Sequence, residues 1–150
     1  MNTAQQYCTF YLDGLFFGVE VKKVQEVIRY QEMTRVPLAS NVVSGLINLR
    51  GQIVTAIDLR RRLGLSERPA GRLPMNVVVR SDEGIVSLLV DEIGDVQEVA
   101  ADLLENTPET LRGEARTLIH GAYKLEGRLL LVLDTELATQ VPEDATASAA

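Results

Sequence analysis

The sequence is poor in the residues on which most enzymes and metal sites depend. Among its 150 residues it has one cysteine, one histidine and no tryptophan. Cys8 cannot form an internal disulfide bond, which is typical of a protein in a reducing cytosol. His120 alone offers neither a nucleophile–base pair nor a cluster of metal ligands. The glycines are too scattered to form a phosphate-binding loop. We therefore expect no enzyme, no catalytic residues, no metal and no cofactor.

The sequence also lacks a long hydrophobic run. The longest uninterrupted apolar stretch is Leu129–Leu133, whereas a membrane-spanning helix needs roughly 18 apolar residues. The first residues, from Met1 to Gln5, carry neither a basic patch nor a hydrophobic stretch, so no signal peptide is visible. We expect a cytoplasmic protein with no direct insertion into a membrane.

Charge is distributed unevenly along the chain. Residues 1–72 hold ten basic and six acidic residues, whereas residues 73–150 hold five basic and fifteen acidic ones, and the net charge is −6. Much of the positive charge lies in one group: Arg60, Arg61, Arg62, Arg68 and Arg72. A solvated helix face is the simplest interpretation of this group. RNA binding is the alternative, although aromatic residues do not alternate with the arginines and the acidic second half would repel phosphate.

Turn residues between short β-branched or aromatic runs predict a mainly β fold. Asp13-Gly14 and Gly51 each lie between two such runs and predict hairpin turns. Asp58 is a good N-cap for a short helix that Gly64 ends. The predicted strands are 7–12, 16–21, 27–30, 46–49, 52–57, 76–80 and 85–90. The other predicted segments are a helical turn at 22–25, the helix at 59–63 and loops at 66–73 and 102–112.

The second half of the chain repeats the pattern of the first. Two glycines, a leucine and an aspartate of segment 45–58 recur in segment 121–134 at a constant offset of 76. Upstream, the apolar and acidic positions of 21–27 recur in 90–96 at an offset of 69. Glycine and aspartate set turn and cap geometry. The repeat therefore predicts two small, similar β-barrels.

Each predicted barrel is small. We expect the first in residues 1–65 and the second in residues 66–140, followed by a disordered tail at 141–150. A domain of about 70 residues gains only a few kcal/mol from its own core. The two barrels should therefore pack on each other, and the groove between them is a natural place for a partner protein.

One stretch of the chain resembles a known family. Segment 45–60, with Asn-Leu-Arg-Gly at 48–51 and Asp-Leu-Arg at 58–60, resembles the signature of the CheW family of chemotaxis coupling proteins. Further similarity extends over roughly residues 6–138, from the first predicted hairpin to the last. The two motifs at this spacing are specific to the family, whereas isolated hairpin turns are not.

The resemblance implies a fold, a function and a set of partners. The implied fold is all-β with a few short helices, as two SH3-like five-stranded β-barrels packed together. The implied function is that of a non-catalytic adaptor between the cytoplasmic tips of methyl-accepting chemoreceptors and the CheW-like regulatory domain of the histidine kinase CheA. Such adaptors act in receptor arrays at the inner face of the membrane.

The resemblance also implies two groups of binding residues. The implied receptor-binding residues are Gly45, Asn48, Arg50, Met75, Val86, Ile93 and Val96. The implied kinase-binding residues are Val24 and Glu26.

The residues leave several alternatives open. Arg50 suits bidentate binding of a partner's carboxylate, and it equally suits an intramolecular ion pair that holds its turn. Glu26 is also interpretable as an exposed charge on a helical turn. The adaptor role fits a non-flagellar chemosensory pathway as well, such as one for twitching motility or gene regulation. An RNA-binding module that uses Arg60, Arg61 and Arg62 is the more distant alternative.

Overall fold

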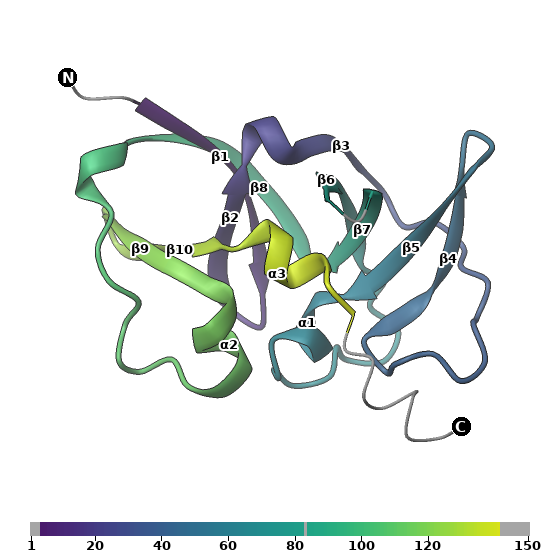
Figure 1. Cartoon of the computed structure of the whole chain (residues 1–150). Coiled ribbons are helices and arrows are strands. Elements are labelled where there is room, and N and C mark those ends of the chain that lie inside the picture. The colour runs from purple at the N-terminus through teal and green to yellow at the C-terminus, as the bar shows by residue number, and fades with distance from the viewer. Residues whose placement is uncertain (1–3, 83, 142–150) are drawn as a thin grey trace.

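The computed structural model describes residues 4–82 and 84–141, which form two five-stranded sheets and short helical segments (Figure 1). The strands are β1 Ala4–Leu12, β2 Leu15–Glu20, β3 Val24–Ile28, β4 Val43–Leu49, β5 Gln52–Asp58, β6 Met75–Ser81, β7 Gly84–Val90, β8 Glu92–Ala100, β9 Ile119–Leu125 and β10 Arg128–Leu133. The helical segments are η1 Val21–Lys23, α1 Leu59–Arg62, η2 Ala101–Leu103, α2 Gly113–Leu118 and α3 Thr135–Thr139. The predicted fold class, mainly β with two five-stranded units, is confirmed.

Each sheet takes strands from both halves of the chain. Sheet A has the order β8-β1-β2-β10-β9, and sheet B has the order β3-β6-β7-β5-β4. Sheet B is thus built from the continuous stretch 24–90, and sheet A from the segments on either side of it. The predicted boundaries, one barrel in 1–65 and one in 66–140, are therefore wrong. The predicted tail falls almost entirely on residues 142–150, which lie outside the described residues.

Each half of the chain supplies a hairpin to the sheet that contains the first hairpin of the other half. This arrangement is possible because the two halves are repeats of each other. β10 lies parallel to β2, and β5 lies parallel to β7, so the last hairpin of each half joins the first hairpin of the other half. Equivalent strands carry the same hydrophobic pattern. The pattern therefore predicts the strands but does not distinguish pairing within one half from pairing between halves.

A short backbone bridge closes each sheet into a barrel. After β3, Thr34 exchanges two hydrogen bonds of 2.8 Å with Leu46 in β4. After β8, Glu105 exchanges hydrogen bonds of 2.8 and 3.0 Å with Ala122 in β9. β3 and β4 are the two edges of sheet B, and β8 and β9 are the two edges of sheet A. Each bridge thus links the open edges of one sheet.

The main hydrophobic core lies between the two sheets. Neighbouring residues of β10 show the alternation: Leu131 packs into the largest buried cluster, whereas Val132 packs into a smaller cluster on the other face of sheet A. The largest cluster contains the stacked rings of Phe10 and Phe17 from sheet A, 5.8 Å apart, together with Leu88 from sheet B. The two barrels therefore pack together through a shared core, as their small size requires.

The predicted turns and caps are present at the repeat-equivalent positions. The carboxylate of Asp58 accepts hydrogen bonds from the backbone N–H groups of Arg60 and Arg61, at 3.1 and 3.5 Å. Asp134 caps α3 in the same way by accepting from Leu137 at 3.0 Å. The helical turn lies at 21–23 instead of 22–25, so β3 begins at Val24. Helix α2 was missing from the prediction.

A buried polar cluster, which we call the Asp91 junction, joins the barrels where the chain passes from β7 to β8. The Asp91 carboxylate accepts two hydrogen bonds from the Arg60 guanidinium, Nε to Oδ1 at 2.9 Å and Nη2 to Oδ2 at 2.5 Å. It also accepts from Arg68 Nε at 3.2 Å and from the backbone N–H of Asp13 at 2.9 Å. Asp13 lies in the β1–β2 turn of sheet A, whereas Arg60 lies in α1, which follows β5 of sheet B directly. Asp91 therefore links the two barrels.

A second cluster, the Glu136 junction, lies at the equivalent place in the other half of the repeat. The Glu136 carboxylate, in α3, accepts a hydrogen bond from Lys23 Nζ at 3.3 Å and one from the backbone N–H of Asp82 at 2.9 Å. Asp82 corresponds to Asp13 at the offset of 69, and Glu136 corresponds to Arg60 at the offset of 76. Helix α3 follows sheet A, so this junction also links the two barrels.

Both junctions favour the ionised form of their carboxylate. Burial raises the pKa of Asp91, but the hydrogen bonds from Arg60 and Asp13 and the positive charges of Arg60 and Arg68 outweigh burial and hold its pKa below the usual range. The backbone N–H of Asp82 and the ammonium of Lys23 likewise lower the pKa of Glu136.

Candidate partner-binding surfaces

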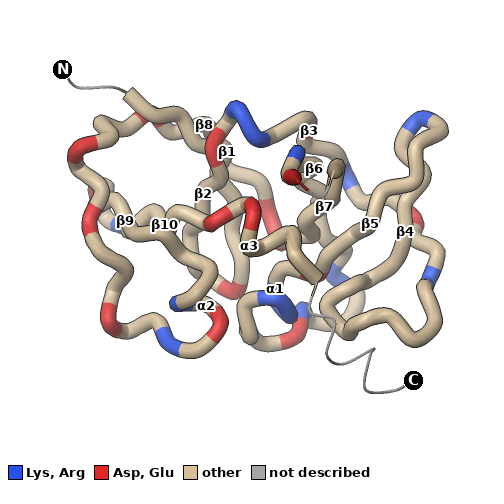
Figure 2. The backbone as a smooth tube through the Cα atoms, in the orientation of Figure 1, with Lys and Arg blue, Asp and Glu red and all other residues tan. Residues whose placement is uncertain are grey.

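The β4–β5 hairpin presents two of the predicted receptor-binding residues at its tip. Arg50 and Gly51 have positive φ angles of 53° and 87°, as in the type I′ turns that suit tight hairpins. Asn48 Oδ1 accepts a hydrogen bond of 2.8 Å from the backbone N–H of Gly51. The side chain of Asn48 thus supports the turn that displays Arg50, whose positive charge marks the hairpin tip in Figure 2.

Arg50 forms an ion pair with Glu26 of β3. The Arg50 side chain is exposed, and that of Glu26 is partly exposed. One residue predicted to bind receptors and one predicted to bind the kinase therefore lie in direct contact. Glu26 lies on a strand, so its interpretation as a charge on a helical turn is wrong. The intramolecular ion pair considered for Arg50 is present, and the exposed guanidinium still leaves donors available to a partner.

Gly45 has a structural reason to be glycine. It is buried in β4, and a Cβ atom at this position would lie 2.7 Å from the carbonyl oxygen of Thr34, in the bridge that closes sheet B. Gly121, its counterpart in β9, makes the same close approach to Glu105, in the bridge that closes sheet A. Gly45 therefore permits the close backbone contact that closes the barrel. Its receptor-binding role stays a prediction.

Four of the predicted apolar contact residues pack into the shared core. Val86 is buried in β7, and Val24, Met75 and Ile93 are partly buried against the same cluster. Val96 differs from them, because its side chain is largely exposed on β8 at the edge of sheet A. Among the apolar residues predicted to bind receptors, Val96 is therefore the one whose side chain is most available to a partner.

The group of arginines in α1 and the loop after it is neutralised within the chain. Arg60 and Arg68 pair with Asp91, Arg61 with Glu67, Arg62 with Glu114 and Arg72 with Glu92. Arg60 is buried, so the solvated helix face expected here is wrong for this residue. RNA binding needs an excess of positive charge at a surface. The carboxylates that pair with this group remove that excess.

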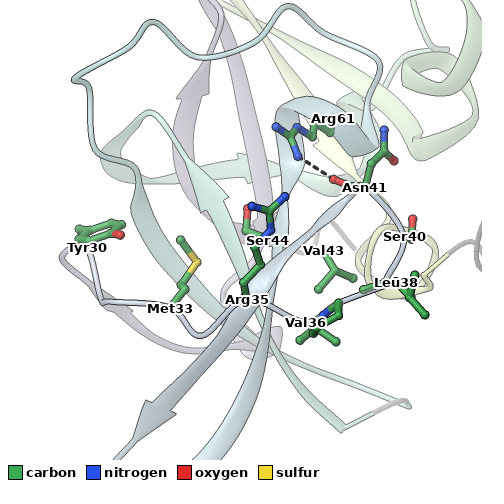
Figure 3. A pocket seen from close by; sticks show the side chains of 12 residues that line it. Tyr30, Met33, Arg35, Val36, Leu38, Ser40, Asn41, Val43, Ser44 and Arg61 are labelled. Atoms are coloured by element: carbon green, nitrogen blue, oxygen red, sulfur yellow. Dashed lines mark hydrogen bonds between the residues drawn. The ribbon is translucent and has the colours of Figure 1, made fainter.

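The sequence interpretation missed a cavity beside β4. The cavity has a volume of about 890 Å³ and is lined by the loop between β3 and β4 together with Arg61 (Figure 3). The proline at position 37 signalled only that a strand ends there. No local pattern in the sequence announces a cavity, because its walls are placed by the closure of the barrel.

Neither a metal-binding cluster nor a membrane-spanning helix is found in the part of the chain that the structure describes. Within residues 4–82 and 84–141, no three His, Cys, Asp or Glu side chains are grouped as metal ligands. In the same ranges, no helix is long and apolar enough to cross a bilayer.

Comparison with known proteins agrees with the motif at 48–60. The CheW-like domain family matches residues 6–142, nearly the whole sequence. The chain belongs to the CheW family. The chemotaxis protein CheW of Bacillus subtilis is 31% identical over 134 residues, which cover 89% of this chain and 86% of the relative. CheW of Klebsiella aerogenes is 29% identical over 135 residues, which cover 90% of this chain and 81% of the relative.

A solved structure supports the architecture independently. The crystal structure of the scaffolding protein TtCheW from Thermoanaerobacter tengcongensis matches with a TM-score of 0.83, at 22% sequence identity. The match covers 93% of this chain and 94% of TtCheW. At this identity the comparison supports the fold, including the two five-stranded barrels. The assignment of individual binding residues depends on the sequence resemblance.

Proposed function

We propose that this chain is a non-catalytic chemotaxis adaptor that couples the cytoplasmic tips of chemoreceptors to the histidine kinase CheA. The observation that carries the proposal is membership of the CheW family over residues 6–142, with the hairpin motif exposed at one end of sheet B. The chain acts in the cytoplasm, in receptor arrays at the inner face of the membrane. Its partners are methyl-accepting chemoreceptors and the CheW-like regulatory domain of the kinase.

The predicted binding residues divide into exposed residues, which contact a partner, and buried residues, which hold the exposed ones in place. Asn48 and Arg50 at the hairpin tip and Val96 on β8 are exposed and form the receptor contacts. Glycine and apolar side chains at five further predicted positions are buried or partly buried and support these surfaces from beneath: Gly45, Met75, Val86, Ile93 and Val24. Glu26 contributes to the kinase contact next to Arg50. An exposed arginine orients a partner's carboxylate, and apolar side chains such as Val96 provide buried contact area.

Weak individual interfaces suffice for such an adaptor. Some transient signalling interfaces bury less than about 1,200 Å² in total. When receptor, adaptor and kinase each offer more than one contact, linkage raises the effective concentration of the remaining contacts. Two modest surfaces on one small protein thus support a stable array.

Substitution of Arg50 by alanine tests the receptor surface. We expect Arg50→Ala to keep the fold, because an exposed ion pair contributes only about 0–1 kcal/mol, and to weaken binding to a purified receptor cytoplasmic fragment. Binding is measured by pull-down and the fold by circular dichroism. Arg112→Ala, which removes an exposed arginine after β8, is the matched control. Unchanged receptor binding by folded Arg50→Ala would refute the role of Arg50.

A second candidate is the same adaptor role in a non-flagellar chemosensory pathway. Protein PilI of Pseudomonas aeruginosa is among the relatives, at 27% identity over 117 residues, which cover 78% of this chain and 66% of PilI. This similarity is weaker than that to the CheW proteins. Deletion of the gene and a soft-agar swimming assay separate the two pathways. Loss of chemotactic spreading, restored by the gene, supports the first candidate, whereas normal spreading supports the second.

A further inference from the structure

The turn between β3 and β4 displays a leucine in an unfavourable conformation. The backbone N–H of Ala39 donates to the carbonyl of Val36 at 3.4 Å, with Pro37 and Leu38 between them. Leu38 has a φ angle of +65°. Proline at the second position and a positive φ at the third are typical of a type II turn, in which glycine or asparagine is preferred at the third position. A leucine there is strained relative to glycine.

Leu38 gains nothing from packing in return. Its side chain is 84% exposed, the highest value among the large hydrophobic residues that the structure describes as exposed. Strain and exposure thus both disfavour leucine at this position in the isolated protein. Residues held in such conformations cluster at functional sites, and an exposed apolar side chain at the end of a turn is suited to insertion into a partner's pocket.

The cavity next to this turn contains an unpaired cation. Arg35 and Arg61 line it together, and Figure 3 shows the two guanidinium groups pointing toward each other. Arg61 is already held by Glu67 and by the carbonyl of Asn41. Arg35 has no hydrogen-bond or ion-pair partner within residues 4–82 and 84–141. The cavity therefore offers one free guanidinium, which matches a carboxylate.

The charge of the surrounding barrel also favours an acidic partner. Residues 24–90, which contain sheet B, have nine basic and six acidic residues, whereas the rest of the chain has six basic and fifteen acidic ones. Most of the arginines in this range have partners within the chain. Arg35 is the unpartnered one that lines the cavity. A partner with like charge would be repelled, and one with a carboxylate near an apolar pocket would be attracted.

We propose that Leu38 and the cavity beside Arg35 form a docking surface for an acidic segment of the kinase regulatory domain. Leu38 enters an apolar pocket of the kinase, and Arg35 pairs with a carboxylate beside that pocket. The kinase is the assigned occupant because the loop continues directly from β3, which carries the predicted kinase contacts Val24 and Glu26. The inference rests on the proposed adaptor function and extends its kinase surface by about ten residues along the chain.

Substitution of Leu38 by glycine separates binding from folding. Because glycine relieves the strain at positive φ, Leu38→Gly should melt at the same temperature as the wild type or higher. It should nevertheless bind the purified kinase regulatory domain about tenfold more weakly or worse, since a buried leucine contact is lost. Arg35→Ala should also weaken kinase binding and reduce its dependence on salt. Arg29→Ala, which removes a nearby exposed arginine outside the cavity, is the matched control and should bind normally.

The same measurements include the results that would overturn the inference. If Leu38→Gly and Arg35→Ala bind the kinase as the wild type does while Glu26→Ala binds less, this docking surface is wrong and the adaptor function stands. If the two variants lose binding to a receptor cytoplasmic fragment and keep the kinase, the assigned occupant is wrong. If the wild-type chain binds neither the kinase domain nor the receptor fragment, the proposed function itself fails.

Discussion

The Asp91 and Glu136 junctions use corresponding segments of the repeat with opposite charges, although Lys23 lies one position after Lys22, the counterpart of Asp91 at the offset of 69. In both, a carboxylate accepts a hydrogen bond from a backbone N–H in the first hairpin turn of one repeat, that of Asp13 or that of Asp82. The same carboxylate pairs with a cation. In the Asp91 junction the cation, Arg60, lies on the helix and the carboxylate on the crossing segment. In the Glu136 junction the carboxylate lies on the helix, and the cation, Lys23, lies on the crossing segment.

The two junctions differ most in their burial. The side chains of Arg60 and Asp91 are 5% and 4% exposed, whereas those of Lys23 and Glu136 are 35% and 33% exposed. A buried, doubly hydrogen-bonded pair is costly to break, but an exposed pair contributes little. The two repeats thus form a polar contact between corresponding segments, but burial determines how much each contact contributes to stability. The barrels should be held firmly at the Asp91 junction and loosely at the Glu136 junction.

The largest loss of stability is expected from Asp91→Asn. The amide keeps the shape of the side chain but leaves the buried guanidinium of Arg60 without its main counter-charge, since Asp13 lies farther away at 3.7 Å. Breaking one partner of a buried ion pair costs about 3–5 kcal/mol, so the free energy of unfolding in urea should fall by that amount. A loss below about 1 kcal/mol would show that burial does not make this junction strong.

The pH dependence of stability should also depend on the Asp91 junction. The pKa of Asp91 is lower in the folded protein than its ordinary value of 3.8. The stabilisation by its ionised form is therefore present above pH 3.8 and is lost as the pH falls below that value toward the folded pKa. Thermal melts between pH 6 and pH 3 should show a smaller acid-side decrease for Asp91→Asn than for the wild type. Equal decreases would contradict the assignment.

Substitutions at the two positions where the barrels close should have intermediate effects on stability. A methyl group at Gly45 would meet the backbone of Thr34, and one at Gly121 would meet the backbone of Glu105. Both Gly45→Ala and Gly121→Ala should destabilise the protein by about 1–3 kcal/mol, as overpacking does. Ser44→Ala, a neighbouring substitution in β4, is the control and should be nearly neutral. If only one glycine variant is destabilised, the two closures are not equivalent.

The smallest loss of stability is expected from Glu136→Gln. The exposed pair with Lys23 is screened by solvent and salt, so the change in melting temperature should be much smaller than that of Asp91→Asn. The amide oxygen of glutamine can still accept the backbone N–H of Asp82. A melting-temperature change as large as that of Asp91→Asn would remove the proposed difference between the junctions.

Local elements were predictable from the sequence because their causes are local. The hairpin at Gly51 and the cap at Asp58 depend on residues within four positions of each other. The ion pair between Arg50 and Glu26 was not predictable as a pair. It joins residues of β3 and the β4–β5 turn, which approach each other only when sheet B forms. For the same reason the sequence gives no sign of the structural role of Gly45, because its close approach to Thr34 exists only in the closed barrel.

By itself, the sequence determined that this protein is mainly β, that it consists of two similar units and that it belongs to the CheW family. These properties follow from short-range patterns of apolar, glycine and aspartate residues. Only the tertiary structure decided which strands pair, because equivalent strands of the two repeats have the same pattern and compete for the same partners. It also decided which charges are buried. The arginines at 60–72 form one group along the chain, but Arg60 is buried against Asp91, which folding brings from a distant segment, while Arg61 lines a cavity and pairs with Glu67 nearby in the chain.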